Sequence, residues 1–206
     1  MRFKGFQPKD FDVFKVDGLD ERMEALQSMV SPKLEALGEA LSPALSAQTG
    51  SEIFPHVARH ARRSVNPPDS TWVAFAENKR GYKKHPHFQI GLWESHLFIW
   101  FAVINEAEHK SAIAQTYKKH LSDIYKIIPK DYVWSKDHTE PDTVPQSEAD
   151  LEEMVNRLKN VKKAELLCGR HIKRDNPILK DGEKLMGEIE KTFQTVMPLY
   201  EWAKEA

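Results

Sequence analysis

The stretch from His96 to Ile104 constrains the fold of this chain more than any other segment. It reads HLFIWFAVI, so an extended backbone would carry apolar side chains on both of its faces. A strand of this kind has to be covered on both sides, which places it in the middle of a sheet. The run from His87 to Trp93 precedes it across a tight Glu94–Ser95 turn. This pattern predicts that the two strands form an antiparallel hairpin.

Three more segments are predicted to add strands to this sheet. Trp72–Ala76 lies between turn-forming residues, Tyr132–Trp134 is short, and Lys163–His171 is apolar in its middle. The pattern over residues 55–63 fits a helix as well as a strand. That choice decides which arginines of the segment share a face with its histidines.

The first strong helical pattern runs from Asp17-Gly18 to Gly50. Its apolar residues recur at steps of three and four, as one helical face requires; they are Leu19, Met23, Leu26, Val30, Leu34, Leu37, Leu41 and Leu45. Ser31-Pro32 and Ser42-Pro43 each resemble a new helix start, with a cap residue followed by proline. We therefore expect one long element, kinked or broken into collinear pieces, that Asp17 caps and Gly50 ends.

Three later segments have the helical pattern as well. One spans 106–127, one follows a capping box formed by Ser147 and Asp150, and the last carries Leu185 to Tyr200 in phase and is bent or shortened by Pro198. The polar stretch 136–148 reads as a surface loop. The order of helices and strands predicts a single α+β domain over residues 1–206, with a mostly antiparallel sheet packed against helices.

Composition narrows the class of protein. The chain has 206 residues, 40% of them apolar, and a net charge of −1, which argues against general binding of nucleic acid or membranes. Its one cysteine, Cys168, excludes an intramolecular disulfide and reads as a small core residue. No window is long and apolar enough to span a bilayer, and the N-terminus does not resemble a secretory signal. We expect a cytoplasmic protein.

The basic residues are concentrated between Ile53 and His87. This block holds seven Lys/Arg and two acids, a charge of 7 − 2 = +5, while the rest has 23 basic and 29 acidic residues, or −6. Four of the nine histidines lie in the same block. Such a block attracts anions without naming one.

Within the block, His56 and His60 are four residues apart and His85 and His87 are two apart. His56 and His60 would share a face in a helix or in a strand, and His85 and His87 would share a face in a strand. Four imidazoles could bind a metal, but the block has no Cys or carboxylate at ligand spacing and no HExxH motif, so we assign no metal and no cofactor. Imidazoles beside arginines also suit a phosphate or carboxylate site.

The candidate ligand-binding set adds residues outside those two pairs. Trp72 is a possible pocket wall, the loop around Gly81 carries lysines, and a smaller cluster follows Cys168 and could join the block across the sheet. The full set is His56, Arg59, His60, Arg62, Arg63, Trp72, Lys83, Lys84, His85, His87, Arg170 and His171. Cys168 next to Arg170 and His171 also invites a nucleophile interpretation, although neighbours along a strand face opposite sides.

Four interpretations of the block remain open. The favoured one is a small anionic ligand, bearing phosphate or carboxylate, bound by a His/Arg cluster. The others are an enzyme with a His general base and Arg charge stabilisation, a nucleic-acid or protein interaction surface, and cations that only form salt bridges. No Walker A, GxGxxG or Gly-x-Ser-x-Gly motif occurs, so the sequence assigns no catalytic residue and leaves the oligomeric state open.

Three segments together resemble a known family. They are FxxFxxDGLDERMEAL near the N-terminus, FPHVARHARRSVNPPDSTWVAF, and YKKHPHFQIGLWESHLFIWFAVI, and the likeness extends to ELLCGRHIKRDNPIL. The chain resembles the UPF0637 (DUF1054, YktB-like) family of Bacillus-type bacteria over nearly its whole length. The resemblance implies a single α+β domain of the YktB-like fold. It implies no activity and no catalytic residues, because the function of that family is not established.

Overall fold

The computed structural model describes residues 3–206. Within them seven strands form one sheet in the order β1-β2-β3-β4-β7-β5-β6, with every neighbouring pair antiparallel. The strands are β1 (Phe54–Val57), β2 (Ser70–Ala76), β3 (His87–Trp93), β4 (His96–Val103), β5 (Val133–Ser135), β6 (Val144–Pro145) and β7 (Leu166–Lys173). The predicted α+β class, with helices packed on a mostly antiparallel sheet, is confirmed.

Strand β4 lies in the middle of this sheet, as its sequence predicts. It pairs with β3 on one side and β7 on the other, and each of its eight residues is buried. The hairpin of β3 and β4 has the predicted bounds within one residue. The open question over residues 55–63 is resolved as strand only up to Val57. The predicted surface loop 136–148 contains the two-residue strand β6, which the sequence pattern did not indicate.

The N-terminal helical region forms collinear pieces. A short α1 (Pro8–Asp12) and the turn η1 (Val13–Lys15), which the pattern did not predict, precede α2 (Leu19–Ala25), the π-helical η2 (Leu26–Val30) and α3 (Ser31–Thr49). Two details of the prediction were wrong. Gly18 rather than Asp17 takes the N-cap position, and Pro43 lies inside α3 without starting a new helix. Gly50 ends α3 with a left-handed φ of 68°, as predicted.

The later helices also follow the sequence with corrections. The predicted helix 106–127 is split at His120 into α4 (Lys110–Lys119) and α5 (Leu121–Ile127). Helix α6 (Leu151–Asn160) is capped by Asp150, whose side chain accepts the backbone N–H of Glu153, whereas Ser147 takes no part. After the turn η4 (Pro177–Lys180), α7 (Gly182–Lys204) continues through Pro198 to the C-terminal end.

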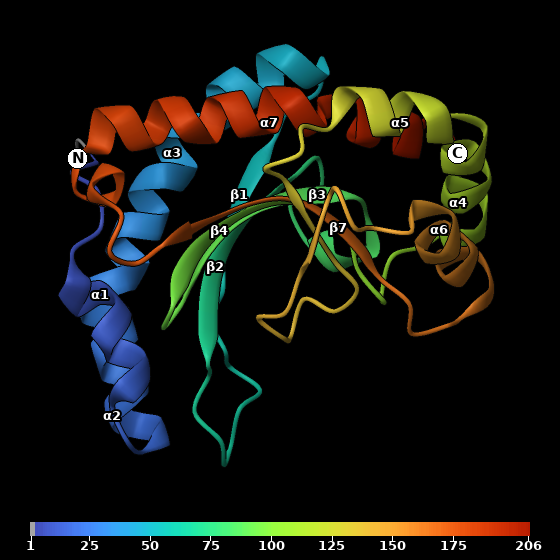
Figure 1. Cartoon of the computed structure of the whole chain (residues 1–206). Coiled ribbons are helices and arrows are strands. Elements are labelled where there is room, and N and C mark those ends of the chain that lie inside the picture. The colour runs from blue at the N-terminus through green and yellow to red at the C-terminus, as the bar shows by residue number, and fades with distance from the viewer. Residues whose placement is uncertain (1–2) are drawn as a thin grey trace.

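The two faces of the sheet have different coverings. Figure 1 shows α7 and α3 across one side, while the segments that join β1 to β2 and β5 to β6 extend on the other side. The large core cluster lies on the helix side and takes alternate strand residues, such as Phe75, Phe88 and Phe101, together with residues of α3, α4, α6 and α7. Helices therefore bury one face of every central strand.

The opposite face carries the second, smaller cluster. Its members are strand residues and Ile104, with none from an α-helix in the described chain, and they include Phe98, Trp100 and Leu167 with Trp72 packed against them. We call this side the helix-free face. Because strand side chains alternate, it is defined by every second residue of each strand; its polar and aromatic members include His56, Trp72, His87, Gln89, Trp93, His96, Phe98, Trp100 and His171.

Candidate functional site

Strand register gathers histidines and aromatic rings on the helix-free face. His56 lies opposite Ala74, which lies opposite Gln89, which in turn lies opposite Trp100. These residues form one row across the four consecutive strands β1 to β4. The alternation that buries phenylalanines on the helix side thus places imidazoles on this side. Residues of this row are positioned by regular strands, which hold side chains more rigidly than loops do.

Trp72 lies at the centre of a group of rings and one cation. Its indole N–H donates to the hydroxyl of Tyr82 at 2.8 Å. The rings of His60 and His138 approach it edge-on, with centroids 5.5 and 6.5 Å away, and Lys83 Nζ lies 5.9 Å from its ring centre. We call these five residues the Trp72 cluster. Two of them, His60 and Lys83, come from the predicted ligand-binding set, as does Trp72 itself.

His56 and His87 flank the Trp72 cluster and use their nitrogens internally. His56 donates from Nε2 to the carbonyl of Asn78 at 2.8 Å and stacks on Tyr82 with centroids 5.1 Å apart. His87 donates from Nδ1 to the carbonyl of His85 at 2.7 Å, so its Nε2 accepts from Gln89 at 2.7 Å. Burial lowers the pKa of His87 to about 4 and lowers the pKa of His56 as well. Both rings are therefore neutral near pH 7.

His60 reaches the Trp72 cluster from an irregular segment. It adopts a left-handed φ of 50°, beyond the end of β1, and its Nε2 lies 3.1 Å from the hydroxyl of Thr71. Burial, followed by the positive charges of Arg63 and Lys83, lowers the pKa of His60 to about 4. His56 and His60 therefore share this region because the chain turns over the edge of the sheet. Their four-residue spacing, which assumed a regular helix or strand, does not explain it.

The three arginines of the segment differ in their partners. Arg63 donates to the backbone carbonyls of Asn66 and Pro67 at 3.2 and 3.1 Å. Arg59 and Arg62 are exposed, and neither meets a carboxylate of residues 3–206. Salt bridges to acidic residues thus do not account for these three guanidinium groups. Their charge remains available to an external anion.

The lysines and His85 lie around the β2–β3 connection. Lys83 pairs with Glu106 at 3.5 Å, and Lys84 pairs with Glu108 at 3.1 Å. Lys84 and His85 line a pocket of about 180 Å³ near the C-terminal helix, beside Glu77 and Tyr200. His85 precedes β3, so it does not share a strand face with His87. The structure therefore brings Lys83 to the Trp72 cluster and separates Lys84 and His85 from it.

Arg170 and His171 point to opposite sides of β7. Arg170 lies on the helix side, where it hydrogen-bonds Glu188 of α7 and pairs with Asp131 at 3.5 Å. His171 lies on the helix-free face, opposite Phe98 in the register, and stacks on His96. Arg170 is thus not brought together with the basic block, because adjacent strand residues alternate. Cys168 is fully buried on the helix side, and burial raises the pKa of its thiol well above the usual value.

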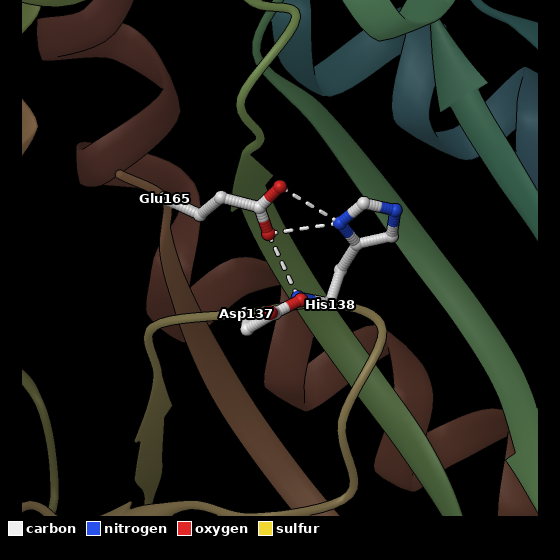
Figure 2. A group of neighbouring side chains, drawn as sticks. All are labelled: Asp137, His138 and Glu165. Carbon is white, nitrogen blue, oxygen red and sulfur yellow. Dashed lines mark hydrogen bonds and ion pairs between the residues drawn. The ribbon is translucent and has the colours of Figure 1, made fainter. Parts of the chain in front are cut away.

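The sequence reasoning missed His138 and Glu165. Figure 2 shows the carboxylate of Glu165 directed at the imidazole of His138, with Nδ1 2.8 and 2.9 Å from its two oxygens. Glu165 also accepts the backbone N–H groups of His138 and Asn105 at 2.7 and 2.9 Å. It is 4% exposed and lies one residue before β7. A histidine in a polar loop gives no signal of this contact.

Asp137, His138 and Glu165 also lie close enough to hold a cation, with one ligand atom from each within 4.8 Å. Their atoms already have other partners. Nδ1 of His138 and both oxygens of Glu165 are joined to each other, and Asp137 Oδ1 accepts from the backbone and hydroxyl of Thr139 at 2.8 and 2.6 Å. The arrangement fits a hydrogen-bonded carboxylate–imidazole pair better than a set of free ligands.

The fold defines an α+β protein with helices on one side of an antiparallel sheet and a face rich in aromatic residues and histidines, many of them buried, on the other. The family model described as a domain of unknown function, DUF1054, matches residues 6–200. The chain is 54% identical to a UPF0637 protein of Bacillus licheniformis, over 95% of this chain and 94% of that protein. It is 48% identical to a UPF0637 protein of Shouchella clausii, over 98% and 95% of the two chains. The chain belongs to the UPF0637 family.

A UPF0637 protein of Oceanobacillus iheyensis is 47% identical over 97% of this chain and 96% of that protein. The family that the sequence resembles is thus confirmed, and its members' names record no activity. Across residues 3–206, no helix combines the length and the apolar character needed to cross a membrane. The function has to be argued from the residues of the helix-free face.

Proposed function

We propose that this protein binds a small ligand bearing a phosphate or carboxylate group, at the Trp72 cluster and the adjoining segment 59–63. The observation behind the proposal is that no arginine of this segment is paired with a carboxylate of the described residues. Arg59 and Arg62 have no acidic partner in the described chain, and Arg63 contacts only backbone carbonyls among its hydrogen bonds. Guanidinium groups match phosphate and carboxylate oxygens in pairs of hydrogen bonds.

The lowered pKa of His60 supports the view that Arg63 and Lys83 both lie near this imidazole. Arg63 and Lys83 both contribute to the lowered pKa of this imidazole, although they lie twenty residues apart in the sequence. Lys83 also lies over the ring of Trp72. A neutral imidazole donates or accepts a hydrogen bond, and a half-buried indole offers an apolar wall. Together these groups suit a small molecule with an anionic group and a ring.

A ligand-stabilisation experiment tests the proposal. The probes are inorganic phosphate, adenosine monophosphate and ribose 5-phosphate, each added to the purified chain during thermal unfolding. A ligand at one hundred times its Kd stabilises the folded state by about 2.7 kcal/mol, so binding raises the melting temperature. Arg62→Ala and His60→Ala are expected to abolish the shift. Arg157→Ala, which removes a cation of α6 that pairs with Glu153, is expected to leave it unchanged.

Two results would contradict the proposal. The first is an unchanged melting temperature with all three probes, which would show that the basic segment binds none of these anions. Binding of a single-stranded oligonucleotide that weakens steeply between 50 and about 300 mM salt, with no response to the small probes, would favour a nucleic-acid surface instead. The cytoplasmic location and the extent of one domain over 1–206 stay predictions.

A further inference from the structure

The pair formed by His138 and Glu165 has the geometry of a general base. Because a carboxylate can only accept, Nδ1 of His138 carries the proton of their hydrogen bonds. Nε2 is then the nitrogen that offers a lone pair when the ring carries a single proton. Nε2 makes no hydrogen bond within residues 3–206. The fully buried side-chain atoms that lack a partner there belong to Asp10, His96 and His171, so Nε2 of His138 is not fully buried. The side chain of His138 is 12% exposed, so Nε2 reaches solvent.

The need to hold the loop of His138 in place does not by itself explain why position 138 carries an imidazole. Glu165 already fixes the segment through the backbone N–H of His138, and it fixes the end of β4 through the backbone N–H of Asn105. These two bonds would form with any side chain at position 138. The side chain adds a ring whose tautomer and direction are set by a buried carboxylate. This arrangement orients a histidine that moves protons in many hydrolases.

His138 is itself a member of the Trp72 cluster. The ring planes of His138 and Trp72 are nearly perpendicular, with centroids 6.5 Å apart. Lys83 lies over the same indole. A phosphate held by the arginines and Lys83 would therefore have a general base and cations near it. Cations close to a phosphate stabilise the charge that its oxygens carry during displacement.

We propose that His138 and Glu165 form a catalytic pair that hydrolyses a phosphodiester bound at the Trp72 cluster, which rests on the proposed anion-binding function. Nε2 of His138 takes a proton from water while the water oxygen bonds to phosphorus. The bond from phosphorus to one ester oxygen breaks, and the protonated Nε2 returns the proton to that leaving oxygen. The products are an alcohol and a phosphate monoester. Glu165 stays ionised and holds the imidazolium in place.

The choice of a diester follows from the groups present. Acyl hydrolysis needs N–H donors aimed at a single developing oxyanion, whereas Lys83 and the arginines of the adjoining segment 59–63 are cations that fit a phosphate. The alkoxide that leaves a diester needs a proton, which His138 returns. The pair of residues thus supplies both proton transfers that the reaction requires.

The experiment uses the full chain with bis(p-nitrophenyl) phosphate in buffer containing EDTA, and it follows release of p-nitrophenol. We expect turnover, a kcat lowered at least about 100-fold by His138→Gln, and a kcat lowered about 10-fold or more by Glu165→Gln with KM nearly unchanged. His120→Gln is the matched control. His120 also has a carboxylate neighbour, Asp123 at 3.6 Å, but it stacks on Trp202 among the helices, so its loss is expected to leave kcat unchanged.

Folding is checked by thermal unfolding of each variant. His138→Gln keeps both backbone bonds to Glu165, so it is expected to remain folded even where Glu165→Gln does not. If the wild-type chain binds the phosphate probes but does not hydrolyse the diester, or if His138→Gln hydrolyses it at the wild-type rate, the catalytic proposal is overturned and anion binding stands. If it neither binds nor hydrolyses, both proposals fail. Turnover that occurs only when EDTA is left out would assign the reaction to a metal and would also overturn the catalytic proposal.

Discussion

His96 and His171 stack on each other on the helix-free face, with ring centroids 3.8 Å apart and planes tilted by 29°. Nε2 of each ring is buried without a hydrogen-bond partner in the described chain, and Nδ1 of His96 lies 2.8 Å from the hydroxyl of Ser95. Burial lowers the pKa of His96 to about 4, and burial together with the charge of His96 lowers the pKa of His171 to about 3. Both imidazoles are neutral in the folded protein near pH 7.

We expect acid to destabilise the fold through this pair. The unfolded chain takes up protons on both imidazoles below about pH 6.5, whereas the folded chain does so only near pH 4 and below. The stabilising contribution is therefore complete above pH 6.5 and is lost as the pH falls toward 4. Each histidine contributes a slope of up to about 1.4 kcal/mol per pH unit. Urea unfolding at pH 7, 6 and 5 measures the slope.

A substitution separates this pair from the other buried histidines. His171→Phe keeps an aromatic ring against His96 and Trp100 but removes one titrating group. The slope between pH 6.5 and 5 should fall by close to one bound proton relative to the wild-type chain. An unchanged slope in His171→Phe would show that the stacked pair does not titrate as described.

Arg170 provides a test of which side of the sheet binds anions. Its guanidinium bonds Glu188 of α7 on the helix side, so Arg170→Gln should lower the free energy of unfolding by about 1–2 kcal/mol. The affinity for inorganic phosphate should stay the same in that variant. Arg62→Ala should weaken phosphate binding and leave the free energy of unfolding nearly unchanged, because Arg62 is exposed and has no acidic partner among the described residues. Calorimetry with both variants measures affinity, and loss of binding in Arg170→Gln would place the site elsewhere.

Tyr82 links the position of Trp72 to the β2–β3 connection. Its hydroxyl accepts the indole N–H at 2.8 Å, and burial raises the pKa of this phenol to about 12. Tyr82→Phe should cost about 1 kcal/mol of stability, because the N–H of a half-buried indole loses its partner. The same variant should shift the tryptophan fluorescence and weaken phosphate binding. Tyr125→Phe, at an exposed tyrosine bonded to Ala149, is the control and should change neither property.

The strands were predictable from local pattern where burial dictated the residues. The apolar run of β4 required a central position, and the turn at Glu94–Ser95 fixed its pairing with β3. His87 and Trp72 reached the helix-free face for the same reason, since strand alternation needs no knowledge of distant segments. The orientation of these two residues was therefore predictable from a regular strand, and their part in a ligand site stays a prediction.

The parts that failed depend on contacts between distant segments. His138 and Glu165 are 27 residues apart, and their bond requires the β5–β6 loop to lie against the start of β7. No local spacing encodes that approach. His60 lies three residues beyond the end of β1 in a left-handed conformation, so periodicity could not place it. Arg170 was assigned to the basic block by charge alone, although its position in β7 relative to His171 puts the two on opposite sides.

Two glycines give a matched test of the packing that supports the helix-free face. Gly169 lies in β7 between Trp100 and Val133, and a Cβ there would overlap the carbonyl oxygen of Ile99. Gly169→Ala should therefore cost about 3 kcal/mol, because neither backbone can move without breaking the ladder. Gly187 lies inside α7 with no atom within 4 Å of an added Cβ. Gly187→Ala should stabilise the chain by about 0.5–1 kcal/mol, as expected for a helix interior. Urea unfolding compares the two variants, and equal changes in the free energy of unfolding would contradict the close contact between β4 and β7.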